Sequence, residues 1–228
     1  MLDLARRAAR SPASVLISGE SGAGKRSLAR WIHQNGARHA GPLIAVGSAA
    51  LSEEMLTSAG RARAQAMFAD AAGGTLVIDE LVELSPEAQA ALIQLLDTPA
   101  LRPTDTSGTR VIATTQHGSR GGRLRADLYY AIAVIAIAVP PLRARPEDIP
   151  ALATSFLSRL PRPAAITGTA LAWLASAEWP GNVRELEATI ERALALSDDS
   201  VIDVEHVASV VNRAVTSPGH RARRSCLR

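Results

Sequence analysis

The sequence predicts an α/β fold, with helices on both faces of a parallel sheet, followed by a small all-helical domain. Short apolar runs alternate with helix-patterned segments in the first part of the chain, and only helical patterns follow. The 228 residues, 47% of them hydrophobic, suffice for one main core and a small second one. We therefore expect an α/β domain over 1–145, a helical domain over 146–212 and a basic, disordered tail over 213–228.

The first two expected strands flank a helix. The apolar run SVLISG at 14–19 is the first strand, and the segment KRSLARWIHQNG at 25–36 has the apolar spacing of a helix. The run PLIAVGS at 42–48 is the second strand, and a polar stretch continues from it to about Gly73. A helix between two strands allows them to run parallel in one sheet.

The remaining strands of the expected sheet follow at regular intervals. TLVIDE at 75–80 precedes a helix at 85–98, which Ser85 caps and in which proline takes the first position. RVIATT at 110–115 is the next strand, and a buried strand is expected from Ala131 in the run AIAVIAIAVPPL. The later helices are expected at 149–160, 167–179, 182–196 and 203–213.

The composition indicates which cellular environment and which classes of partner to expect. No apolar run approaches the roughly 20 residues of a membrane-spanning helix, so we expect no membrane partner. The single cysteine, Cys226, excludes an internal disulfide and fits a cytoplasmic protein. The net charge of +3 is too small to indicate nucleic acid by itself. The arginines of the tail could contact nucleic acid or an acidic partner, but a solvated end is the commoner role of such a cluster.

A glycine-rich loop follows the first expected strand. GESGAGK fits the pattern G-x-x-x-x-G-K between a strand and a helix, where backbone N–H groups and the helix N-terminus surround phosphate oxygens. Lys25 is the only lysine of the chain, and its compact ammonium suits the β- and γ-phosphates. We expect the nucleotide to contact Gly19, Glu20, Ser21, Gly22, Ala23, Gly24, Lys25, Arg26 and Ser27. Arg26 stands where many such loops have the Ser or Thr that touches Mg²⁺.

An acidic pair ends the strand of GGTLVIDEL. Asp79 and Glu80 lie at the carboxyl edge of the sheet, where open α/β sheets bind their ligands. Alone, such a pair is more often a helix cap. Together with the phosphate loop it predicts that Asp79 holds Mg²⁺ and that Glu80 polarises the attacking water.

Five segments together resemble one known family. GESGAGK, GGTLVIDE, RLRADLYY, PPLRARPEDIP and WPGNVRELE resemble, in order and spacing, the central AAA+ domain of bacterial enhancer-binding proteins that activate sigma-54 RNA polymerase. The resemblance covers the chain from about Leu2 to Asn212. It implies a P-loop NTPase of the AAA+ class, with a helical lid, that works as an ATP-driven ring of itself or related subunits.

The resemblance also implies two arginine roles. Arg184 would sense the γ-phosphate from the lid, and Arg125 would reach into the neighbouring subunit's site as a finger. A fixed guanidinium in either position neutralises the charge that develops on the transferred phosphoryl group. Alternatively, Arg184 is a surface helix residue paired with Glu185 or Glu187.

The sequence differs from the family at positions that have mechanical or signalling roles in the family. The segment before GGTL is short and contains no GAFTGA loop, which grips the sigma factor in the family. The family's asparagine that restrains the catalytic glutamate aligns with Gly47, which has no amide. A second arginine of the finger region aligns with Ala131, and Gln116 replaces the asparagine that usually ends the sensor strand.

These features lead to three functional hypotheses. The preferred one is an ATP-binding regulatory subunit that joins or modulates rings of full-length relatives, linked only indirectly to sigma-54 polymerase. The alternatives are a stand-alone ATPase that remodels another partner and a structural remnant that binds no nucleotide. Any ATPase activity is expected to be weak and to depend on assembly. No DNA-binding domain is evident in the sequence.

Overall fold

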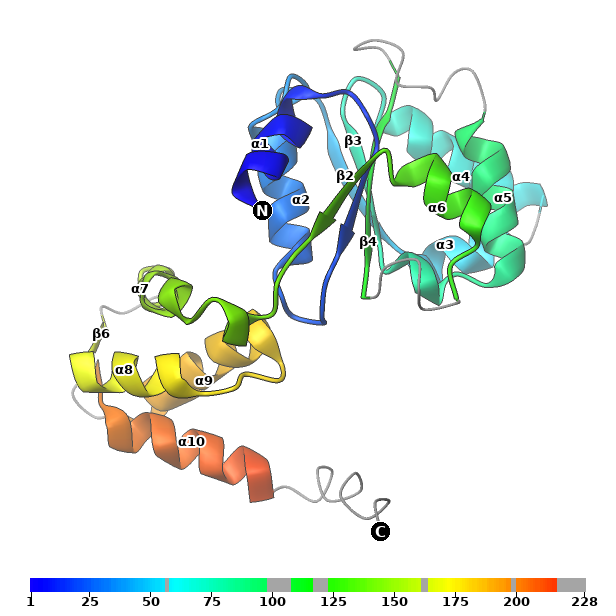
Figure 1. Ribbon diagram of the computed structural model, residues 1–228. Helices are drawn as coiled ribbons and strands as arrows, with labels where there is room; N and C mark the ends of the chain where they lie inside the picture. The colour runs from blue at the N-terminus through cyan, green and yellow to red at the C-terminus, as the bar shows by residue number, and fades with distance from the viewer. Residues whose placement is uncertain (56–57, 98–107, 117–122, 161–163, 198–199, 217–228) are drawn as a thin grey trace. The chain divides into compact units, whose positions relative to one another are not determined.

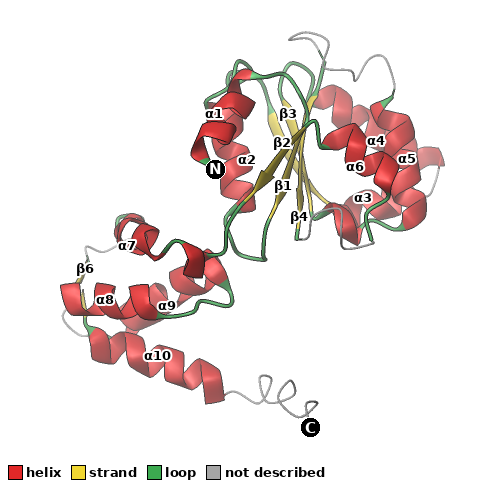
Figure 2. Ribbon diagram, in the orientation of Figure 1, coloured by secondary structure: helices red, strands yellow, loops and turns green. Residues whose placement is uncertain are grey.

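The computed structural model of the chain describes residues 1–55, 58–97, 108–116, 123–160, 164–197 and 200–216. The chain divides into two compact units, Met1–Val139 and Pro140–Arg228, so the break falls a few residues before the expected boundary at 145. The first unit contains the parallel sheet with helices on both faces that the sequence predicts (Figure 1). The second unit is mostly helical (Figure 2). Most of the expected tail, 213–228, lies outside the described residues.

The sheet has five parallel strands in the order β2-β3-β4-β1-β5. The strands are β1 (Val15–Ser18), β2 (Leu43–Gly47), β3 (Thr75–Asp79), β4 (Arg110–Thr115) and β5 (Ile135–Ala138). Because β4 lies between β1 and β3, the carboxyl ends of these three strands are neighbours. The chain therefore brings the loop after β1 and the acidic pair after β3 to the same edge of the sheet, which is the usual ligand edge of such sheets.

Two helices cover one face of the sheet. These are α1 (Leu2–Arg10) and α2 (Lys25–Gln34), which lie side by side in Figure 1. Val15 and Ile17 of β1 are fully buried against this layer, while Leu16 between them joins the core on the opposite face. This alternation follows from the two-residue period of a strand, and it explains why β1 is apolar throughout.

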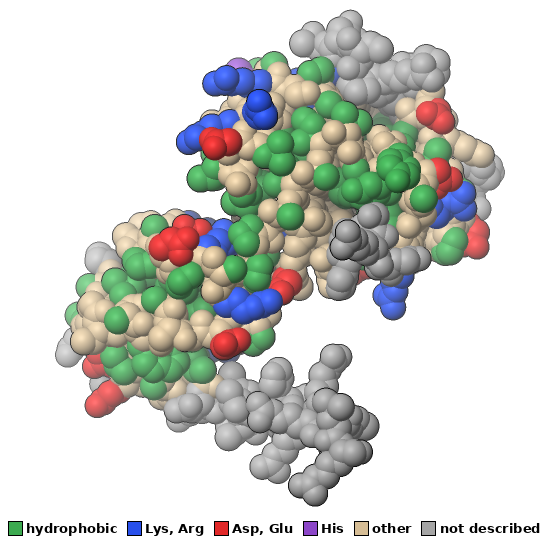
Figure 3. Space-filling model, in the orientation of Figure 1, with side chains coloured by type: hydrophobic (Ala, Val, Ile, Leu, Met, Phe, Trp, Pro, Cys, Tyr) green, Lys and Arg blue, Asp and Glu red, His purple; other side chains and the backbone are tan. Residues whose placement is uncertain are grey.

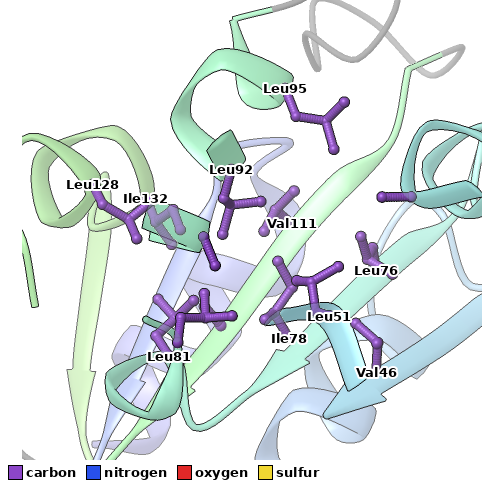
Figure 4. Packing of buried hydrophobic residues seen from close by; sticks show 14 of the residues in the cluster. Val46, Leu51, Leu76, Ile78, Leu81, Leu92, Leu95, Val111, Leu128 and Ile132 are labelled. Carbon is purple, nitrogen blue, oxygen red and sulfur yellow. The ribbon is translucent and has the colours of Figure 1, made fainter. Parts of the chain in front are cut away.

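Four helices cover the other face: α3 (Ser48–Met55), α4 (Ser58–Asp70), α5 (Pro86–Leu96) and α6 (Ala126–Ile132). Figure 4 shows the larger core beneath them, where Leu92 and Leu128 lie above the sheet residues Ile78 and Val111. The hydroxyl of Ser85 accepts the backbone N–H of Ala88 at 3.2 Å, so the predicted helix cap is confirmed.

One local prediction was wrong. The strand expected from Ala131 begins only at Ile135, because Ala131 and Ile132 complete α6 and Ile132 packs into the larger core. The polar stretch up to Gly73, for which the sequence predicts no particular element, forms α3 and α4, each of which needs only one buried face. That face includes the fully buried Phe68.

The second unit packs four helices around its own core. They are α7 (Ile149–Leu157), α8 (Gly168–Ser176), α9 (Asn182–Leu196) and α10 (Val204–Thr216). The expectation of helices alone missed a short parallel pair, β6 (Ala165–Ile166) and β7 (Val201–Ile202). Each strand has only two residues, which is too short for an alternating pattern to be visible in the sequence.

One cluster of basic side chains in the first unit lies over α1. Figure 3 shows arginine side chains gathered there, and the sequence of α1 includes Arg6, Arg7 and Arg10. Arg6 is paired with Asp3 at 3.1 Å, and both side chains are exposed. Such exposed pairs contribute little to stability. None of the helices within the described ranges is long and apolar enough to cross a membrane.

The stability of the first unit is expected to depend on pH through His33. Its buried ring contacts the Thr75 hydroxyl at 3.0 Å, and burial lowers its pKa below 6.5, with Arg110 and His39 acting in the same direction. The unfolded chain therefore takes up this proton first as the pH falls below about 6.5, so stability decreases from there towards the folded-state pKa. We expect the melting temperature to fall less in His33→Gln than in the wild type between about pH 7.5 and 5.5. An equal decrease in the melting temperatures of His33→Gln and the wild type, measured by circular dichroism, would contradict this prediction.

Candidate functional site

The loop between β1 and α2 contains the residues predicted to bind phosphate, 19–27. The backbone N–H of Gly19 donates to the carbonyl of Thr115 at 3.1 Å. A Cβ on Gly19 would lie only 2.8 Å from the carbonyl oxygen of Val139, so a larger residue does not fit there. Gly24 caps α2 with a φ of 99°, a conformation that glycine adopts without strain. The glycines thus allow the loop to close tightly over the sheet edge.

Lys25 reaches back across this loop. Its ammonium donates to the carbonyls of Gly19 at 2.8 Å and Glu20 at 3.2 Å, and it lies 2.8 Å from Oε1 of Glu80. The residue is 5% exposed, and these three contacts match the three protons of its ammonium. A phosphate entering the loop would exchange neutral carbonyl partners for charged oxygens, which bind an ammonium more strongly.

Asp79, at the end of β3, already has partners for both of its oxygens. Oδ1 accepts the hydroxyl of Thr114 at 2.5 Å, while Nε and Nη2 of Arg26 lie 2.6 and 2.5 Å from Oδ2. The residue predicted to hold Mg²⁺ therefore carries a guanidinium instead. The described residues contain no group of three or more His, Cys, Asp or Glu that could hold a metal ion. In this arrangement the side chains do not fit Mg²⁺ at Asp79.

Glu80 has one carboxylate oxygen available for chemistry. Oε1 is paired with Lys25, whereas Oε2 is buried and has no hydrogen-bond partner among the described residues. An ionised carboxylate oxygen accepts protons, so Oε2 can take one from a water molecule held beside it. Gly47 lies opposite Asp79 in the sheet register, and a Cβ at Gly47 would meet no atom within 4 Å. Glycine therefore leaves space where the family has a restraining amide.

Two further residues of this site escaped the sequence analysis. The Thr114 hydroxyl accepts the backbone N–H of Glu80 at 3.0 Å besides donating to Asp79. The Ser48 hydroxyl lies 2.5 and 2.6 Å from the backbone carbonyls of Asp79 and Glu80. The available signal was their position at the carboxyl ends of β4 and β2, but it has meaning only once the strand order is known.

Arg125 lies apart from these contacts, immediately before α6. Its backbone N–H donates to Oε1 of the buried Gln89 at 2.8 Å, and Gln89 also donates to the carbonyl of Arg123 at 2.9 Å. The side chain is exposed and pairs with Asp127 at 2.8 Å, a contact that raises the pKa of Arg125. The backbone is thus anchored, while the guanidinium points into solvent and can exchange its partner.

Arg184 belongs to the second unit and is exposed on α9. Of the two carboxylates named as alternative partners, Glu187 lies 2.8 Å from Arg159, and Glu185 accepts the backbone N–H of Gly181 at 2.7 Å. These contacts do not exclude a pairing of either carboxylate with Arg184. Because the two units are described separately, Arg184 is not placed relative to Lys25. Its predicted contact with nucleotide remains a prediction.

Comparison with known families covers both units. Residues 1–138 match the model of the family described as "Sigma-54 interaction domain", and residues 143–223 match that of the "AAA+ ATPase lid domain". Together the two matches run through nearly the whole chain.

Known proteins similar to this chain are bacterial regulators. It is 37% identical over 222 residues to the Phenol regulator MopR of Acinetobacter guillouiae. This alignment covers 86% of this chain and 40% of that protein. It is 39% identical over 211 residues to the Transcriptional regulatory protein ZraR of Escherichia coli strain K12, covering 82% and 48%. The solved structure of NtrX from Brucella abortus in complex with ATP matches with a TM-score of 0.75 at 28% identity, covering 93% of this chain and 55% of that one. The chain spans less than half the length of these two curated relatives.

Proposed function

Because the chain belongs to the sigma-54 interaction domain family and has the α/β AAA+ fold, we propose that it binds ATP and regulates sigma-54-dependent transcription as a cytoplasmic protein. The loop from Gly19 to Ser27 would hold the phosphates, with Lys25 at the β- and γ-phosphates. The ATP-bound NtrX structure supports this assignment, since it shares the fold at 28% identity.

The regulatory role rests on the connection between β2 and β3. Helix α3 begins at Ser48, directly after β2, and ends at Met55, while α4 begins at Ser58, so two residues join the helices. A further short connection leads from Asp70 to β3 at Thr75. The sequence between β2 and β3 contains no GAFTGA stretch, the motif that grips the sigma factor in the family that the chain resembles. We therefore propose that the chain joins or modulates rings of full-length relatives without itself engaging the sigma factor.

Hydrolysis in such a ring would be weak and dependent on assembly. Glu80 would polarise the attacking water, and Arg125 of a neighbouring subunit would neutralise charge on the γ-phosphate. Arg184 would approach the same phosphate from the lid. Since Gly47 offers no amide to restrain Glu80, turnover would be poorly controlled by partner binding.

One alternative keeps some support. The unpartnered Oε2 of Glu80 would equally serve a stand-alone ATPase that remodels another partner. A remnant that binds no nucleotide is harder to reconcile with the intact phosphate loop, which keeps Gly19, Gly24 and the only lysine of the chain, Lys25.

The test uses the purified chain in transcription with sigma-54 polymerase. The chain alone, with ATP, is expected to give no open promoter complexes, because its sequence contains no GAFTGA motif to engage sigma. Added to a full-length family member, it is expected to change the yield of open complexes in a manner that depends on the amount added. Clear open complexes with this chain as sole activator would contradict the proposal, as would no effect on the full-length protein at any ratio.

A further inference from the structure

The ion pair between Arg26 and Asp79 occupies the place where nucleotide-bound metal is expected. Two guanidinium nitrogens lie within 2.6 Å of Oδ2, and the other oxygen is held by Thr114. Arg26 is the residue directly after Lys25, so the loop that would receive the phosphates also supplies this cation. The contact joins residues 53 positions apart, from α2 and β3.

Four charged side chains at this edge of the sheet are paired with one another. Lys25 and Arg26 are cations, Asp79 and Glu80 are anions, and they form two ion pairs. The Asp79 side chain is 13% exposed, so water screens its charge poorly. Without a cation beside it, this carboxylate would repel the phosphates of ATP. A divalent metal ordinarily removes such repulsion in phosphate-binding sites, and here a covalently attached guanidinium does so.

We propose that Arg26 is an internal counter-ion that replaces the divalent cation during nucleotide binding, so that this chain binds metal-free ATP about as well as ATP with Mg²⁺. This inference rests on the proposed binding of ATP by the chain. It concerns the binding step alone and assigns no role to Arg26 in hydrolysis.

The surroundings of Arg26 suit this role. Its side chain is 71% exposed and lines a pocket of about 270 Å³ together with Arg30, Gly47 and Asp79. The hydrogen bond that Arg26 donates to Asp79 raises the pKa of Arg26, so the guanidinium stays charged at all ordinary pH values. A single exposed side chain can be replaced without opening the core, which makes the pair accessible to substitution. Arg30, one helical turn further along α2, is exposed on the same pocket and provides a matched control.

Calorimetric titration with ATP, in EDTA and in excess Mg²⁺, tests the proposal. The wild type is expected to show dissociation constants within about threefold of each other in the two buffers, because the counter-ion is already present. Arg26→Ser is expected to bind ATP about tenfold or more weakly in EDTA and to regain most of that affinity with Mg²⁺. For Arg30→Ser, the ratio of the dissociation constants in EDTA and in Mg²⁺ is expected to equal that of the wild type. Thermal melts of each nucleotide-free variant establish that it is folded.

The possible results separate this inference from the proposed function. Tight ATP binding by the wild type in Mg²⁺ but not in EDTA would overturn the counter-ion role and leave ATP binding intact. The same dependence on Mg²⁺ in Arg26→Ser and wild type would also overturn it, as would an equal change in Arg30→Ser, which would indicate a general effect of positive charge. Failure of the wild type to bind ATP in either buffer would refute the proposed function and this inference together.

Discussion

Lys25→Ala is expected to remove most of the affinity of the chain for ATP. The substitution deletes an ammonium that is buried beside the phosphate loop and that contacts Gly19, Glu20 and Glu80. Loss of one charge-assisted phosphate contact costs about 2–3 kcal/mol, which corresponds to a dissociation constant about 30- to 150-fold higher. It also leaves the Glu80 carboxylate without its cation, which adds repulsion towards the nucleotide.

Calorimetry with ATP measures this effect directly. Arg30→Ala on the same helix removes an exposed cation and is expected to leave the affinity within about twofold, because exposed charges are strongly screened. Equal affinities of wild type and Lys25→Ala would show that ATP, if it binds, does so elsewhere.

Arg125→Ala is expected to reduce ATP turnover by about a thousandfold or more while leaving ATP binding unchanged. Among the described residues, the guanidinium forms an ion pair with the neighbouring Asp127, and its exposed position leaves it free to turn towards another subunit in the proposed ring. The backbone N–H that anchors Arg125 to Gln89 is retained in the alanine variant, so the segment before α6 should keep its conformation. The large effect therefore reports on the side chain alone.

Turnover should be measured over a range of protein concentrations. If the finger acts between subunits, the specific activity of the wild type rises with concentration, whereas that of Arg125→Ala stays low throughout. Arg123→Ala replaces an exposed arginine two residues away and is expected to retain most of the activity. Activity that is independent of concentration, or unaffected by Arg125→Ala, would exclude a site shared between neighbouring subunits.

The fold was largely predictable because its signals are local. The strands at Val15 and Thr75 are continuous apolar runs bounded by glycine or acidic residues, and Ser85 is an ordinary helix cap. The failure at Ala131 has a local cause as well. The run AIAVIAIAV has apolar residues at every position, so its pattern cannot show where α6 ends and β5 begins.

The site was predictable only as far as its motifs extend. The loop and the acidic pair are recognisable because each lies within a few consecutive residues. The contacts of Asp79 with Arg26 and Thr114 join residues 53 and 35 positions apart, and they depend on the strand order and on side-chain conformations. The sequence showed Arg26 as an unusual residue, but nothing in it indicated that the guanidinium would lie on the residue expected to bind metal.

The conformation of Glu80 ties the proposed catalytic carboxylate to the spacing of three strands. Its φ of 59° places a non-glycine residue in the left-handed region, a strain of order 1 kcal/mol or more. Ser48, directly after β2, and Thr114, in β4, hold this turn from opposite sides of β3. We therefore expect a displacement of either neighbouring strand to relax the strained turn and to reorient Glu80. A shift between strands would then change the position of this carboxylate without any contact to the nucleotide.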